Sequence, residues 1–168
     1  MIYRLPPPDD PLDQGDIVEA CPILELTEYD LDGRKPLATT YALQRIVVLT
    51  QTCDLANAKT RLVLVAVVLD AQGLIEQQKV KAADVRGPIR AGRVYGWYFL
   101  PRSAELGLPE MIVDLRQVQT VRFDLLTALC RRGQRKARVQ PLYREHLAKH
   151  FADTYSRIGL PQPYETQP

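Results

Sequence analysis

The sequence predicts a single, mainly β domain of the α+β class that ends in an amphipathic helix. Two aliphatic runs, residues 45–50 and 62–69, have the length and β-branched content of central strands buried on both faces. Near the end of the chain, apolar residues recur at helical spacing, which predicts the helix. At 168 residues the chain is long enough for one well-buried core and too short for two independent domains.

The first part of the chain is expected to lead into this core. Prolines concentrate between Pro6 and Pro11, and because proline fixes φ and lacks an amide hydrogen, residues 1–13 should be an extended lead-in. Gly15 then frees the backbone to enter the first strand. The pair Asp32-Gly33 is typical of a hairpin turn. We assign residues 14–130 to the core and residues 141–160 to the terminal helix.

The segments between residue 70 and the terminal helix have less regular apolar patterns than the two aliphatic runs. Strands are expected at residues 94–100 and, with a bend, at 111–121. Residues 74–85 have a short helical pattern, and Asp124 is a plausible N-cap for a helix over residues 125–131. The terminal helix is expected to be stopped by Gly159 and Pro161.

Composition narrows the class of protein. Hydrophobic residues make up 46% of the chain and charged residues 25%, as in globular proteins. The longest apolar run is far shorter than the roughly 20 residues that cross a bilayer, and the first residues lack a signal-peptide pattern, so we expect a cytoplasmic protein with no membrane partner. Cys21, Cys53 and Cys130 have no CxxC spacing, which argues against a disulfide framework and a four-cysteine zinc site.

Charge is unevenly distributed along the chain although the formal net charge is only +2. Residues 1–33 are strongly acidic and residues 131–150 are strongly basic. A basic stretch of this kind suits phosphate backbones, and the candidate nucleic-acid-binding residues in it are Arg132, Arg135, Lys136 and Arg138. The alternative is that the stretch is a solvated face, or is neutralised by the acidic end of the same chain.

Four segments follow one another in an informative order. They are Gly15-Asp16-Ile17, the run Arg-Ile-Val-Val-Leu-Thr-Gln at 45–51, the aliphatic run 63–68, and residues 112–121. This order resembles the strands of the MazF/PemK toxin family, in which a Gly-Asp-Ile/Val start precedes an Arg-Pro-Val-Val-Val-Leu strand, an aliphatic strand and a strand that leads into a helix. The resemblance covers roughly residues 14–130.

The resemblance implies an SH3-like barrel of the MazF/PemK type and metal-independent, endoribonuclease-like chemistry. In that family an arginine on the second strand acts with a serine or threonine at the end of the next strand. Arg45 matches the arginine, whereas Ile46 replaces the usual proline and Leu69 stands where the hydroxyl residue would fall. The partners that the resemblance implies are RNA, an antitoxin or other protein, and a second copy of the chain. It implies no cofactor.

A polar loop separates the two aliphatic runs. Its start, 50–55, and the chain's ending at 143–161 resemble a group of uncharacterised bacterial proteins with a Ser/Thr-Gln-Ser/Thr-Cys-Asp-Leu loop. Loops between buried strands often carry function, so Gln51, Cys53 and Asp54 are candidate catalytic residues, together with Arg45, which the resemblance implies. The structural alternative is a small buried thiol at Cys53 and a turn or N-cap carboxylate at Asp54.

Two further groups have residue types that can form sites. His146 and His150 lie four residues apart on one helical face, with Asp153 nearby, but Lys149 adds adverse charge and no His-Glu-x-x-His pattern is present, so no metal site is predicted. Trp97 belongs to an aromatic run that is typical of a core wall and, alternatively, of a base-stacking platform.

Two functions from different classes remain open. The first is a MazF-like, nucleic-acid-associated protein that binds RNA through Arg45 and the basic stretch 131–138. The second is a catalytically inactive barrel that acts as a protein-interaction or small-molecule-binding module through residues 51–57. The basic stretch favours the first narrowly, and Leu69 in place of a hydroxyl residue favours the second.

Overall fold

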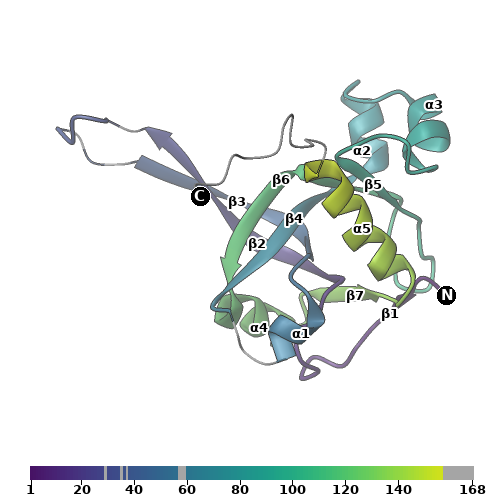
Figure 1. Cartoon of the computed structure of the whole chain (residues 1–168), viewed down its shortest axis with the longest axis horizontal. Coiled ribbons are helices and arrows are strands. Elements are labelled where there is room, and N and C mark those ends of the chain that lie inside the picture. The colour runs from purple at the N-terminus through teal and green to yellow at the C-terminus, as the bar shows by residue number, and fades with distance from the viewer. Residues whose placement is uncertain (29, 35, 37, 57–59, 157–168) are drawn as a thin grey trace, which may run out of the picture.

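The computed structural model of this chain contains one sheet of seven antiparallel strands (Figure 1). The structure describes residues 1–28, 30–34, 36, 38–56 and 60–156. The strands are β1 (Tyr3–Arg4), β2 (Asp16–Glu28), β3 (Ala38–Val48), β4 (Leu62–Asp70), β5 (Trp97–Leu100), β6 (Met111–Arg122) and β7 (Arg135–Val139). The helices are α1 (Thr52–Ala56), α2 (Ala71–Glu76), α3 (Ala82–Asp84), α4 (Phe123–Arg131) and α5 (Tyr143–Tyr155), with a π-helical turn, η1, at Val85–Ile89.

The two aliphatic runs form neighbouring strands at the middle of the sheet, whose order is β1-β7-β2-β3-β4-β6-β5. β3 and β4 pair through Ile46 with Val67, Val47 with Ala66, and Val48 with Val65. All six side chains are buried. The prediction of central strands that are covered on both faces is therefore confirmed.

β6 pairs with β4 along most of its length but changes register in the middle. Val67 lies opposite Asp114, and the preceding residue of β4, Ala66, lies opposite Val118. Residues 115–117 therefore bulge out of the ladder, and such a bulge bends a strand and redirects its side chains. This confirms the predicted strand with a bend.

Helices cover both faces of the sheet. Leu147 of α5 packs into one core cluster with Val47, Ala66 and Leu115. Leu126 of α4 packs into a second cluster on the other face, and α2 and η1 cover a third, smaller cluster.

The two outermost strands of the sheet come close to each other. The hydroxyl of Tyr3, in β1, donates a hydrogen bond of 2.7 Å to the carbonyl of Pro101, which directly follows β5. Tyr3 is almost fully buried. One side chain thus spans the space between the first and last strands of the sheet order.

One strand was missed by the sequence analysis. Residues 135–139, which were assigned to the basic stretch, form β7 between β1 and β2. This strand was not recognised because its arginines make the segment look exposed. Their burial depends on Asp16, which lies 119 residues from Arg135 and 122 from Arg138 along the chain. Local patterns carry no information about such a partner.

Other boundaries shift by a few residues. The helical pattern at 74–85 corresponds to α2 and α3, and the aromatic strand β5 begins only at Trp97. Asp124 lies in the first turn of α4, where Arg122 is the N-cap residue. The lead-in 1–13 contains the short strand β1. The terminal helix is confirmed as α5, and its predicted stop at Gly159 and Pro161 lies outside the described residues.

Within the described ranges, no helix is long and apolar enough to span a bilayer.

Candidate functional site

Two of the four predicted nucleic-acid-binding residues lie in the interior. Arg135 and Arg138 are 3% and 5% exposed, and they flank Asp16, which is fully buried. Arg138 Nε donates to Asp16 Oδ1 at 2.6 Å, and Arg135 NH1 donates to Oδ2 at 3.1 Å. A paired carboxylate compensates the cost of burying such guanidinium groups, and in the interior they are inaccessible to a phosphate backbone. The placement of these two residues on a nucleic-acid surface is therefore corrected.

The same arginines fasten the lead-in to the sheet. Arg135 donates hydrogen bonds to the carbonyls of Pro7, Pro8, Asp10 and Pro11. Arg138 also pairs with the Asp10 carboxylate at 2.7 Å. Carbonyls of a proline-rich segment need external donors, because the segment forms no ladder of its own. For these residues, the acidic end of the chain neutralises the basic stretch.

The other two members of the basic stretch remain outside this cluster. Arg132 follows α4 and is exposed, as is its neighbour Arg131. Lys136 Nζ donates to the carbonyl of Gly133 at 3.0 Å. Of the basic stretch 131–138, the exposed cations are therefore Arg131 and Arg132, at the end of α4.

Arg45 lies at an irregularity between β2 and β3. The register shifts between Val18 and Cys21, and Ala20 adopts a left-handed φ of 54°. This bulge directs Glu19 toward Arg45, whose NH2 and Nε groups donate to Glu19 Oε1 at 2.6 and 3.0 Å. Both side chains are partly buried. Arg45 is thus held by an ion pair at the base of the β2–β3 hairpin.

The predicted catalytic loop forms a short helix. Gln51 precedes α1, which contains Cys53 and Asp54, and Leu55 anchors it in the core cluster beneath α4. Cys53 is exposed, and its Sγ lies 3.7 Å from Gln51 Oε1 and 3.8 Å from Asp54 Oδ1. The structure brings these three predicted residues together, and it corrects the alternative in which Cys53 is a buried thiol.

The two histidines of α5 face β5. His146 Nδ1 lies 3.2 Å from the Tyr98 hydroxyl, and His150 Nε2 lies 3.2 Å from the carbonyl of Val94. Burial, followed by the charge of Tyr143, raises the pKa of Tyr98 to about 12, so its hydroxyl stays protonated at neutral pH. No group of three or more His, Cys, Asp or Glu side chains suited to a metal ion occurs in the described part of the chain.

The bulge of β6 carries a second ion pair. Asp114 is nearly fully buried and accepts hydrogen bonds from Arg116 N, Nε and NH2 and from Gln117 Nε2, at 2.8–3.1 Å. Burial by itself raises the pKa of Asp114, but the hydrogen bonds and charge of Arg116 outweigh it, so the pKa lies below its ordinary value. The Arg116 guanidinium lies 4.8 Å from the centre of the Trp97 ring. One face of this ring is thus covered rather than open for base stacking.

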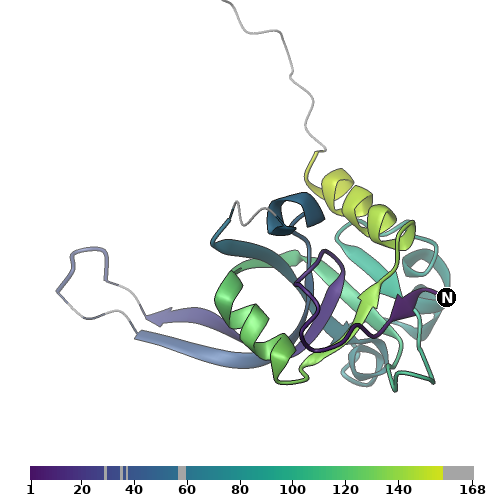
Figure 2. The ribbon, with the colours of Figure 1, turned by 90° about the horizontal axis from the view of Figure 1, so that it is seen from below.

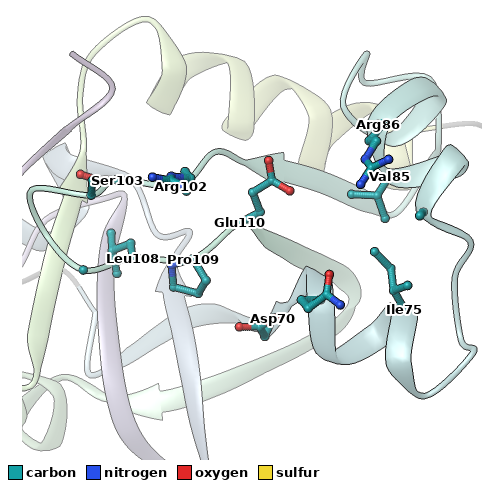
Figure 3. Close-up of a pocket in the computed structure, with 13 residues that line it drawn as sticks. Asp70, Ile75, Val85, Arg86, Arg102, Ser103, Leu108, Pro109 and Glu110 are labelled. Carbon is teal, nitrogen blue, oxygen red and sulfur yellow. The ribbon is translucent and has the colours of Figure 1, made fainter.

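A pocket of about 580 Å³ lies between the loop before β6 and the segment of α2 to η1 (Figure 3). Arg102 and Glu110 line one side of it and Arg86 the other, above Ile75 and Leu108. A neighbouring pocket of about 620 Å³ lies beside Trp97 and Arg116. Charges of both signs line each pocket, so neither presents the uniform charge that selects an anion or a cation.

β2 and β3 extend beyond the rest of the sheet as a two-stranded arm (Figures 1 and 2). β7 pairs with β2 only at residues 16–18, and β4 pairs with β3 only at residues 46–48. The outer parts, residues 22–28 and 38–44, therefore pair only with each other within the described chain. Among the described residues, the backbone groups on both edges of this arm have no strand partner, which makes them a template for association.

One face of the arm is apolar. Leu24 lies directly opposite Tyr41, and Pro22 lies opposite Leu43. Because side chains alternate between faces along a strand, Leu26 shares this face. We call it the apolar arm face; its exposed fractions are 66% for Leu24, 54% for Leu26, 64% for Tyr41 and 62% for Leu43. The opposite face carries Glu25 paired with Thr40.

The apolar arm face was not predicted from the sequence, although its alternation is visible at residues 24–26 and 41–43 around the predicted turn. The missing information was that β4 and β7 end before they reach these residues. The chain matches no model of a known protein family, and no curated protein is detectably similar to it.

Proposed function

We propose that this chain is a protein-interaction module and that the β2–β3 arm is its binding element. The observation that carries the proposal is the apolar arm face, in which four large side chains, each more than half exposed, lie side by side on an otherwise unsupported hairpin. Contiguous apolar surface of this kind marks an interaction site, whereas single exposed apolar residues do not. This is the class of the second function that the sequence left open, a protein-interaction module, but the binding element is the arm instead of residues 51–57.

The physical argument rests on the marginal stability of a lone hairpin. A two-stranded ribbon in water lacks a second layer against which to bury its apolar residues. Here the strands continue well past their last contacts with β4 and β7. A protein that covers the apolar arm face would supply that layer. Neither of the two pockets includes a residue of the arm. The apolar arm face is therefore an open surface, and a polypeptide suits such a surface better than a small molecule, which binds in concave sites.

The proposal includes the finer fold type. We propose that the sheet closes as an SH3-like barrel of the kind that the MazF/PemK resemblance implies. The hydrogen bond from Tyr3 to Pro101 supports this closure, because it links the two outermost strands of the sheet order. In such a barrel, the arm is an extension of two wall strands beyond the closed body.

RNA association receives less support from the geometry. Arg135 and Arg138 are committed to Asp16, and Arg45 is committed to Glu19. Within the basic stretch 131–138, the exposed Arg131 and Arg132 are fewer than the several phosphate contacts on which nucleic-acid affinity depends. Association with RNA, and the MazF/PemK-like activity that it would serve, remain a prediction from the resemblance.

Site-specific photo-crosslinking in cells tests the proposed function. A benzophenone amino acid replaces Tyr41 on the apolar arm face or, in the matched control, Thr40 on the opposite face of the same strand. We expect irradiation to join a discrete protein to the chain from position 41 and not from position 40. No crosslink from position 41, or the same products from both positions, would overturn the proposal.

A further inference from the structure

We infer that the protein covering the apolar arm face is a second copy of this chain, whose own arm packs against it face to face in an antiparallel crossing. This inference rests on the proposed function and deepens it by naming the partner. It would make each arm the missing layer of the other. The contact would be isologous, so the same residues of both copies contribute.

The register of the arm makes its apolar face suitable for pairing with itself. Leu24 lies across from Tyr41 near the middle of the face, and Leu26 and Leu43 lie toward its two ends. A two-fold axis through the middle therefore brings the Leu24–Tyr41 pair of one copy onto that of the other. With four large side chains from each copy, more than half of each exposed, complete burial of the apolar arm face on both copies would bring the contact to the roughly 1,000 Å² at which specific interfaces begin.

Charge selects the direction of the crossing. Between positions 22 and 44 the sequence has Glu25, Glu28, Asp30 and Asp32 against Arg34 and Lys35, although the whole chain has a formal net charge of +2. A parallel arrangement would bring two acidic tips together. The antiparallel crossing separates the tips and places each one toward the body of the other copy, which carries the excess of positive charge. Such complementarity sets orientation more than affinity.

Arg45 lies where the acidic tip of the other copy would arrive. It is two residues beyond Leu43 on β3 and so lies on the same face of the strand. Its guanidinium, held in place by Glu19, is already oriented by an ion pair. Because Glu19 already balances the charge of Arg45, this contact contributes to the orientation of the acidic tip rather than to net attraction.

The test is the molar mass of the purified full chain, measured by sedimentation equilibrium from low to high micromolar concentration. We expect a reversible monomer–dimer equilibrium. Tyr41→Lys should raise the dissociation constant by about thirty-fold or more, because it removes a central aromatic contact. Thr40→Lys introduces the same charge on the neighbouring residue of the same strand but on the opposite face, and should leave the dissociation constant within about twofold of the wild-type value.

A second measurement avoids dependence on the folding of the variants. Hydrogen exchange of the wild-type chain at low and high concentration should show slower exchange of residues 22–28 and 38–44 at the high concentration only. A monomer at every concentration, or equal weakening by both lysine variants, would overturn the inference. If the chain is monomeric but position 41 still crosslinks a different protein in cells, the second copy is excluded and the proposed function stands. If neither a dimer nor a crosslink is found, both fail.

Discussion

Asp16 Oδ1 accepts a hydrogen bond of 2.6 Å from Arg138 Nε, although the two residues lie 122 positions apart in the sequence. Asp16 begins β2 and Arg138 lies opposite it in β7. Together with Arg135, they form a buried charged cluster that holds the proline-rich lead-in against the sheet. The cluster converts the opposite charges of the two ends of the chain into a tertiary contact.

Removal of the central charge should therefore destabilise the fold. Asp16→Asn keeps the shape of the side chain but leaves two buried guanidinium groups without a neutralising negative charge. We therefore expect the free energy of unfolding to fall by about 3 kcal/mol. Urea denaturation measures this change. Asp9→Asn, at an exposed position in the same lead-in, is the control and should change the free energy by less than about 0.5 kcal/mol. Equal midpoints for both variants would contradict the structural role of the cluster.

The Asp114–Arg116 pair predicts a dependence of stability on pH. The pKa of Asp114 in the folded chain is below its ordinary value of 3.8. The ionised carboxylate therefore contributes fully to the free energy of unfolding at pH values well above 3.8, and this contribution is lost as the pH falls through the folded pKa. Asp114→Asn should cost about 2 kcal/mol at pH 7, because hydrogen bonds to a charged group are replaced by weaker ones. The difference in the free energy of unfolding between wild type and Asp114→Asn should become smaller below a pH of about 4.

Urea titrations at neutral and acidic pH measure this narrowing. Glu105→Gln, at an exposed position, serves as the control and should follow the wild-type curve at both pH values. A difference between wild type and Asp114→Asn that is the same at both pH values would show that the effect arises from packing alone.

Arg45→Ala separates the structural role of this residue from the role implied by the resemblance. Because Arg45 pairs with Glu19, we expect its loss to lower the free energy of unfolding of the monomer by about 0.5–1 kcal/mol, and Glu19→Ala to have a similar effect. A double-mutant cycle with both substitutions measures their coupling. In an RNA titration at fixed low salt, we expect wild type and Arg45→Ala to bind equally. Clearly weaker binding by Arg45→Ala would support the nucleic-acid hypothesis instead.

The three thiols should differ in reactivity. Cys53 is exposed on α1, whereas Cys21 and Cys130 are buried, and burial raises the pKa of each buried thiol to about 11. Since the thiolate is the reactive form, native protein treated with a maleimide at pH 7 should gain one label, as measured by intact mass. Cys53→Ser should gain none under the same conditions. Labelling of two or more thiols in folded wild-type protein would contradict the burial of Cys21 and Cys130.

Local patterns in the sequence were sufficient for much of the fold. The aliphatic runs predicted β3 and β4, the break between two apolar stretches predicted a bend in β6, and helical spacing predicted α5. Each of these elements is determined by residues that are neighbours along the chain. The loop at residues 51–54 was likewise identified as one local unit, and the structure keeps its three candidate residues together on and beside α1.

The amino-acid sequence by itself thus determined that the aliphatic runs at 45–50 and 62–69 form central strands and that acidic and basic segments occupy opposite ends of the chain. Tertiary structure alone decided that Arg135 and Arg138 are internal, because a guanidinium is buried or exposed according to whether a distant carboxylate meets it. It also decided that Leu24 and Tyr41 remain exposed. An alternating strand pattern specifies an apolar face, but the lengths of the neighbouring strands determine whether anything in the same chain covers that face.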